Sequence, residues 1–134
     1  MVPAPELDAR PRRILIVEDE PLVRAVLAEN LRDAGFSVVE ATNAGEALAY
    51  IGAASPVDLV FSDVRMPGPL DGIALARQLK TTHPLLPVIL TSSEPGSGNI
   101  SDLGPFIQKP YRQAQAIALV VQTLGLRKPN ESDE

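Results

Sequence analysis

Short, predominantly apolar runs recur along this 134-residue chain, and they restrict its fold more than any other feature. The first, Arg13 to Val17, reads RILIV, and comparable runs occupy residues 57–62 and 87–91. A strand that is apolar at every position has both faces buried, which is typical of a parallel sheet covered by helices on both sides. Two shorter runs, at residues 36–40 and 105–108, are expected to be further strands.

Between these runs, apolar residues recur at the spacing of a helix. Such stripes occupy residues 21–34, 43–51, 70–80 and 112–124. The first stripe includes Val26, and the last is expected to face inward through Ala114. Pro21 suits the first turn of a helix, and Asn43 followed by Glu46 resembles a capping box. The alternation of strands and helices predicts an α/β fold with a parallel sheet.

The stretch after the fourth apolar run is different. Residues 92–99 read SSEPGSGN, a composition that opposes helix because Pro costs ~3 kcal/mol and Gly ~1 kcal/mol relative to Ala. Only Ile100 and Leu103 could anchor this stretch to a core. We therefore expect residues 93–99 to form a mobile loop in the free protein, followed by at most one helical turn.

Composition excludes several classes of function. The chain has no cysteine, which removes disulfides, thiolate metal sites and thiol nucleophiles together. Its net charge of −5 is unlike that of a nucleic-acid-binding domain, which normally carries a basic face. No apolar run approaches the ~18 residues of a membrane helix, and the N-terminus lacks the features of a secretory signal. We therefore expect a single cytoplasmic domain with no contact to nucleic acid or membrane.

Chemically distinctive residues follow four of the expected strands. Glu18 and Asp19 follow the first, Asp63 ends the third, Thr91 ends the fourth, and Lys109 follows the fifth. Taken singly, each has an ordinary explanation, since acidic residues before a helix favour its positive end and a lone lysine is usually solvated. However, in an open parallel sheet the carboxyl ends of the strands are where ligands bind.

Together these residues predict a phosphoryl-transfer site. Three carboxylates at adjacent strand ends repel one another unless a cation joins them, and hard oxygen ligands favour Mg²⁺. The lysine and the hydroxyl would then supply charge and a hydrogen bond to phosphoryl oxygens. Such a site can move a phosphoryl group onto a carboxylate. The chain has neither a GxxxxGK[ST] loop nor a GxGxxG sequence after its first strand.

Five motifs then occur in an order that resembles the receiver domain of two-component response regulators. They are ILIVEDE at 14–20, FSDVRMPG at 61–68, LDG at 70–72, VILTS at 88–92 and KPY at 109–111. The resemblance implies a flavodoxin-like, doubly wound, five-stranded parallel sheet of order 2-1-3-4-5 with five helices. Because the interval from Thr91 to Lys109 is shorter than usual by about one helical turn, we expect the fourth helix to be reduced or replaced by a loop.

The resemblance also implies the roles of the acidic residues. Asp63 would accept a phosphoryl group from a histidine kinase or a histidine phosphotransfer protein. Asp19, Asp63 and the main-chain carbonyl of Arg65 would bind Mg²⁺, and Glu18 would act through a water molecule.

The other residues implied by the resemblance lie on the last two strands. Lys109 would pair with the phosphoryl oxygens, in front of a cis peptide bond to Pro110, and Thr91 would turn to hydrogen-bond the same oxygens. Phe106 would occupy the aromatic switch position, although simple core filling is an equal alternative for it. Ser92 departs from the family, which usually has Ala or Gly at that place.

We interpret the chain as a stand-alone, single-domain response regulator. Residues 1–11 are expected to be a flexible leader, 12–125 the receiver, and 126–134 a flexible tail. The protein would serve as a phosphoprotein in a phosphorelay and signal by binding an unknown downstream protein. It would not be an enzyme beyond autophosphorylation from small phosphodonors and self-dephosphorylation.

Three alternatives remain open at this point. The chain could be the excised C-terminal receiver of a hybrid histidine kinase. A Mg²⁺-dependent aspartyl phosphatase of the haloacid dehalogenase type would need a second acid two residues after Asp63, where this chain has Arg65. A flavodoxin would have a Ser-, Thr- and Gly-rich loop after the first strand, where the acidic run at 18–20 would repel a phosphate.

Overall fold

The computed structural model describes residues 11–53, 55–94 and 102–126. Its five strands are β1 (Arg13–Val17), β2 (Ser37–Ala41), β3 (Leu59–Asp63), β4 (Val88–Ser92) and β5 (Phe106–Gln108). The helices within the described residues are α2 (Pro21–Asp33), α3 (Ala44–Gly52), α4 (Gly72–Thr82) and α5 (Gln113–Leu124). All neighbouring strands pair in parallel, in the order β2-β1-β3-β4-β5. This order confirms the fold class expected from the sequence.

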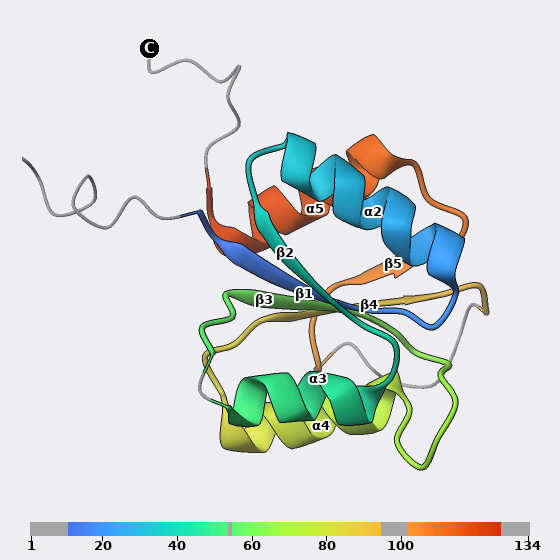
Figure 1. The fold of residues 1–134 in the computed structure, drawn as a ribbon, viewed down its shortest axis with the longest axis vertical. Helices are drawn as coiled ribbons and strands as arrows, with labels where there is room; N and C mark the ends of the chain where they lie inside the picture. Colours follow the sequence, from blue (N-terminus) through green and yellow to red (C-terminus); the bar gives the residue numbers. More distant parts are fainter. Residues whose placement is uncertain (1–10, 54, 95–101, 127–134) are drawn as a thin grey trace, which may run out of the picture.

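Helices cover both faces of the sheet, with α2 and α5 on one side and α3 and α4 on the other (Figure 1). Alternate residues of each strand therefore enter different cores. In β1, Ile14 and Ile16 belong to the core beneath α2 and α5, whereas Leu15 and Val17 belong to the core beneath α3 and α4. The uninterrupted apolar runs of the sequence are explained by this double burial. Among the described residues, no helix is both long enough and apolar enough to cross a membrane.

The ends of the helices agree with the sequence, but not every residue of the expected apolar stripes faces the core. Pro21 starts α2, and Asn43 caps α3 by accepting a hydrogen bond from the Glu46 amide at 2.8 Å. Val26 is an exposed large hydrophobic residue, and Ala114 is also exposed. In α5 the fully buried residues are Ala116 and Val120, because the side of the helix nearest the sheet is rotated away from Ala114.

The connection between β4 and β5 is described only at its two ends. Ser93 and Glu94 continue from β4, and a turn at Asp102 and Leu103 leads to β5. None of these described residues is helical, as expected for a reduced fourth helix. Most of the predicted mobile loop and of the following helical turn, together with the predicted leader and tail, fall outside the described residues.

The start of α4 lies directly against the main chain at the end of β3. The Gly72 amide donates a hydrogen bond to the Val64 carbonyl at 2.7 Å, and Asp71 caps the helix by accepting from the Ala74 amide at 2.8 Å. A Cβ atom at Gly72 would overlap the carbonyl oxygen of Asp63. Glycine is therefore required here by close approach and not by an unusual backbone angle.

We expect Gly72→Ala to lower the free energy of unfolding by about 1–3 kcal/mol, because the new methyl group must displace α4 or β3. Gly52→Ala in α3 is the matched control, since a Cβ there meets nothing within 4 Å. The control should raise stability by about 0.5–1 kcal/mol through helix propensity. Urea denaturation measures both changes, and a Gly72→Ala variant as stable as wild type would contradict the close-packing argument.

Candidate functional site

The topology brings the polar ends of the central strands to one edge of the sheet. Val17 pairs with Ser62, so Glu18, which follows β1, lies at the same edge as Asp63, the last residue of β3. Asp63 in turn pairs with Thr91 on β4. The chain leaves β1 toward β2 on one side and returns to β3 on the other, which makes this edge the switch point where open α/β sheets bind ligands.

Lys109 joins the two buried carboxylates at this edge. Its Nζ atom lies 2.8 Å from Glu18 Oε1 and 3.2 Å from Asp63 Oδ2. The peptide between Lys109 and Pro110 is cis, as expected. The Lys109 amide also donates to the Ser92 carbonyl at 2.9 Å, which fixes the start of this turn against β4. One ammonium group therefore faces two carboxylates that are largely withdrawn from water.

Burial and charge shift the ionisation of all three groups. Burial raises the pKa values of the Glu18 and Asp63 carboxyls, and this effect exceeds the lowering caused by Lys109. Burial alone would lower the pKa of Lys109, but the hydrogen bonds and charges of Glu18 and Asp63 raise it overall. The lysine is therefore charged at neutral pH, and ionising either carboxyl group costs more free energy than it would in water.

Asp19 adds a third, exposed carboxylate to this cluster. Glu18, Asp19 and Asp63 each offer an oxygen atom, and these atoms lie within 4.8 Å of one another. Three carboxylates against one ammonium leave an excess of negative charge in a set of hard oxygen donors, which fits Mg²⁺. The residues present thus suit the metal that the sequence implied.

Thr91 contributes a hydroxyl group without a partner. Its side chain is buried, and its Oγ1 atom makes no hydrogen bond within the part of the chain that the structure describes. Buried polar atoms are nearly always hydrogen-bonded, so an unpaired one on the strand next to Asp63 requires an explanation. A phosphoryl oxygen on Asp63 would provide the missing partner.

Phe106 does not fill the core. It opens β5, and its side chain remains 37% exposed, whereas Ile107 beside it is buried. The alternative of simple core filling is therefore wrong for Phe106. Its role as an aromatic switch stays a prediction.

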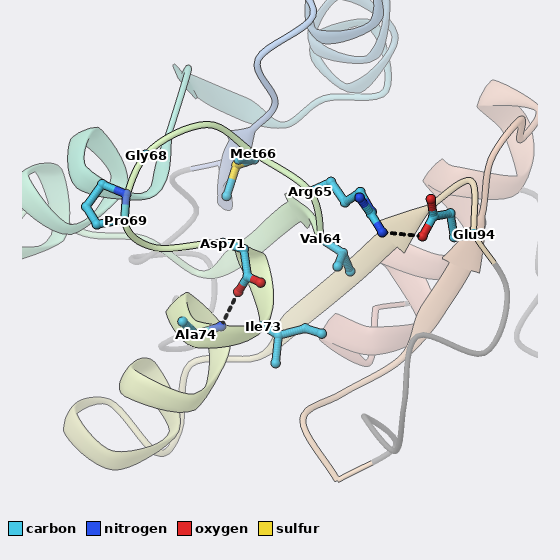
Figure 2. A pocket seen from close by; sticks show the side chains of 9 residues that line it. All are labelled: Val64, Arg65, Met66, Gly68, Pro69, Asp71, Ile73, Ala74 and Glu94. Atoms are coloured by element: carbon cyan, nitrogen blue, oxygen red, sulfur yellow. Dashed lines mark hydrogen bonds and ion pairs between the residues drawn. The ribbon is translucent and has the colours of Figure 1, made fainter.

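Arg65 and Glu94 form a contact that the sequence did not predict. Arg65 Nη2 lies 2.6 Å from Glu94 Oε1, and the pair borders a surface hollow beside the start of α4 (Figure 2). These residues are 29 positions apart and lie on two loops. The opposite charges of Arg65 and Glu94 were the one feature of the sequence that could have indicated this ion pair. The sequence does not show that the two loops are adjacent, which follows only from the pairing of β3 with β4.

Comparisons with known proteins agree with this geometry. The family model described as "Response regulator receiver domain" matches residues 14–120. The DNA-binding transcriptional regulator NtrC of Salmonella typhimurium is 34% identical over 117 residues, which are 84% of this chain and 24% of that protein. The receiver domain of NtrX from Brucella abortus is 34% identical, with a TM-score of 0.77, and the match covers 85% of this chain and 99% of that structure.

A receiver domain from a hybrid kinase is also similar. The receiver domain of the hybrid histidine kinase CckA is 36% identical, with a TM-score of 0.71, over 84% of this chain and 98% of that structure. The chain spans about a quarter of the length of the curated relatives it matches. The match therefore concerns one domain of those longer proteins.

We expect Asp63→Asn to raise the free energy of unfolding in EDTA by about 0.5–2 kcal/mol, because the change removes excess buried negative charge while Lys109 keeps Glu18 as a partner. Added Mg²⁺ should raise the melting temperature of wild type more than that of the variant.

The pH dependence has a defined sign. Because the pKa of Asp63 is raised in the folded state, the stability it contributes is present below the unfolded-state pKa and is lost as pH rises through the folded-state value. The advantage of Asp63→Asn over wild type should thus grow as pH rises toward neutrality. Thermal unfolding across pH measures it, and an advantage that shrinks with rising pH would contradict the assignment.

Proposed function

Because this chain belongs to the response regulator receiver domain family, we propose that it accepts a phosphoryl group on Asp63 from a histidine kinase or a histidine phosphotransfer protein. The single observation that carries the proposal is the contact of Lys109 with both Glu18 and Asp63. This contact gives the buried carboxylate a fixed position and a cation able to stabilise an incoming phosphoryl group.

Transfer requires only rearrangement of bonds at phosphorus. A carboxylate oxygen of Asp63 attacks the phosphorus of a phosphohistidine, the new P–O bond forms as the P–N bond breaks, and the imidazole leaves with the electron pair. Lys109 offsets the charge of the phosphoryl oxygens. The Thr91 hydroxyl, unpaired among the described residues, donates a hydrogen bond to one of them.

The acidic cluster supports a role for Mg²⁺ in this reaction. Glu18, Asp19, Asp63 and the main-chain carbonyl of Arg65 would hold the ion, with Glu18 acting through water. When bound, Mg²⁺ neutralises part of the charge that the carboxylates and the phosphoryl group bring together.

The signal would pass to another protein through the segments next to Thr91 and Phe106. The unpaired hydroxyl of Thr91 and the exposed ring of Phe106 support this proposal. No catalytic turnover is proposed beyond autophosphorylation from small phosphodonors and self-dephosphorylation.

Whether the domain acts alone or within a longer protein is a separate proposal, and we favour the stand-alone regulator. The alternative, that the chain is the receiver of a hybrid histidine kinase, is supported by the similarity to the CckA receiver domain. DNA binding by NtrC describes a protein of which this chain matches 24%. The expectation that this domain itself does not bind nucleic acid stays a prediction, supported by its charge of −5.

Incubation with acetyl phosphate and Mg²⁺ should label wild type with an alkali-labile phosphoryl group, and EDTA should prevent labelling. Asp63→Asn should remove the label because it removes the nucleophile. Asp102→Asn is the control, since Asp102 is also acidic but pairs with Lys80 on α4 and not with the acidic cluster. Full labelling of Asp63→Asn would refute the proposed acceptor.

An apolar hollow next to Lys109 is the proposed docking site of the phosphodonor. It has a volume of about 510 Å³ and lies between α2 and the turn that leads to α5. Leu22, Val23 and Val26 line it from α2, and Pro110 and Tyr111 line it from the turn. Leu22 is 79% exposed, which is unusual for a large apolar side chain beside a charged site. A donor must touch this region to bring its phosphohistidine to Asp63.

Leu22→Glu should slow transfer from the phosphorylated kinase that phosphotransfer profiling identifies by about tenfold, a loss of about 1.4 kcal/mol in the transition state. Labelling by acetyl phosphate should not change, because a small donor needs no docking surface. Leu85→Glu is the matched control: Leu85 is 95% exposed but lines a different hollow, beside the start of β4. Equal kinase transfer to the Leu22→Glu variant and to wild type would exclude this surface.

A further inference from the structure

The ion pair between Arg65 and Glu94 links the two loops that follow β3 and β4. Figure 2 shows the two side chains pointing toward each other from these two loops. The side chains are 73% and 54% exposed, so the pair contributes little to stability by itself. The position of the pair matters more than its strength, because Arg65 comes two residues after Asp63 and Glu94 comes three residues after Thr91.

Glu94 is fixed in position by the end of β4. Its amide donates a hydrogen bond to Ser92 Oγ at 3.1 Å, and Ser92 is buried in the strand. The Ser92 carbonyl in turn accepts the amide of Lys109. Ser92 thus connects the position of Glu94 to the position of the lysine that contacts Asp63.

Arg65 lies where the chain leaves the sheet. The preceding residue, Val64, is fixed by its amide, which donates a hydrogen bond to the Thr91 carbonyl at 2.8 Å, and by its own carbonyl, which accepts one from the Gly72 amide. The side chain of Arg65 is restrained by the contact of its guanidinium group with Glu94.

We propose that Glu94 is a positioning residue for cation binding: by pairing with the Arg65 side chain, and itself fixed by Ser92, it restricts the orientation of Arg65 and so prepares its main-chain carbonyl as a metal ligand. This inference rests on the proposed function, which assigns that carbonyl to the Mg²⁺ site. It adds Glu94, which is not a member of the acidic cluster, and Ser92, which holds the Glu94 amide.

Charge alone makes a different prediction from positioning. If Arg65 and Glu94 affected Mg²⁺ only by the Coulomb interaction of their charges with the ion, removing the arginine would strengthen Mg²⁺ binding and removing the glutamate would weaken it. If the pair positions the carbonyl, either change weakens binding. The sign of the Arg65 effect therefore separates the two explanations.

The test is a Mg²⁺ titration of the full chain followed by amide NMR, without any phosphodonor. Arg65→Gln and Glu94→Gln should each weaken Mg²⁺ binding about two- to fivefold, the most that an exposed pair can supply. The double variant should lose no more than either single variant, because both remove the same contact. Ser92→Ala should weaken binding in the same direction.

Asp102→Asn is the matched control. It also removes an exposed acidic charge from the β4–β5 connection, but Asp102 pairs with Lys80 at 3.6 Å and Arg77 at 4.0 Å on α4. Its Mg²⁺ affinity should equal that of wild type. Unfolding midpoints in EDTA show that the variants remain folded.

Tighter Mg²⁺ binding by Arg65→Gln, or unchanged binding by both single variants, would overturn the positioning role while leaving the proposed function intact. Failure of wild type to bind Mg²⁺ would instead overturn the proposed function, and this inference with it. Weakened binding by both single variants without additivity in the double variant is the result that supports it.

Discussion

The structure depends on two carboxylates that are buried at the ends of adjacent parallel strands and share one lysine. Parallel strands with apolar residues on both faces place their polar residues at the strand ends, where the two cores stop. There, Glu18 and Asp63 have raised pKa values because water is excluded, and Lys109 compensates only part of their charge. This surplus of negative charge lowers the stability of the fold, and in the proposed function it provides the site for a cation and a phosphoryl group.

The surroundings of this cluster are arranged around the main chain of Asp63. Gly72 brings the start of α4 against its carbonyl. Thr91, whose hydroxyl has no partner among the described residues, pairs with it from the next strand. Each contact comes from a different element. A phosphoryl group on Asp63 would therefore act on the start of α4 and on the end of β4 at the same time. A local change in charge could in this way alter a surface that partners bind.

The sequence predicted the sheet and most of the site because both follow from strong local signals. Apolar runs identify buried parallel strands, and the topology alone places the residues at or just after their carboxyl ends, Glu18, Asp63 and Lys109. Contacts between loops were not predictable in this way. The pairing of Arg65 with Glu94 depends on the β3–β4 register, and the exposure of Val26 and Ala114 depends on how each helix is rotated against the sheet. Helical periodicity shows that a helix has an apolar face, but it does not show which residue of that face lies closest to the sheet.

The central claim is that Asp63 carries the phosphoryl group, and chemical trapping tests it most directly. Borohydride reduces an aspartyl phosphate to homoserine, so wild-type protein treated with acetyl phosphate, Mg²⁺ and then borohydride can be digested and its peptides sequenced by mass spectrometry. The account predicts homoserine at position 63 and unmodified aspartate at position 19. Homoserine at another aspartate, or a phosphoryl group found on His83 with position 63 unmodified, would contradict it.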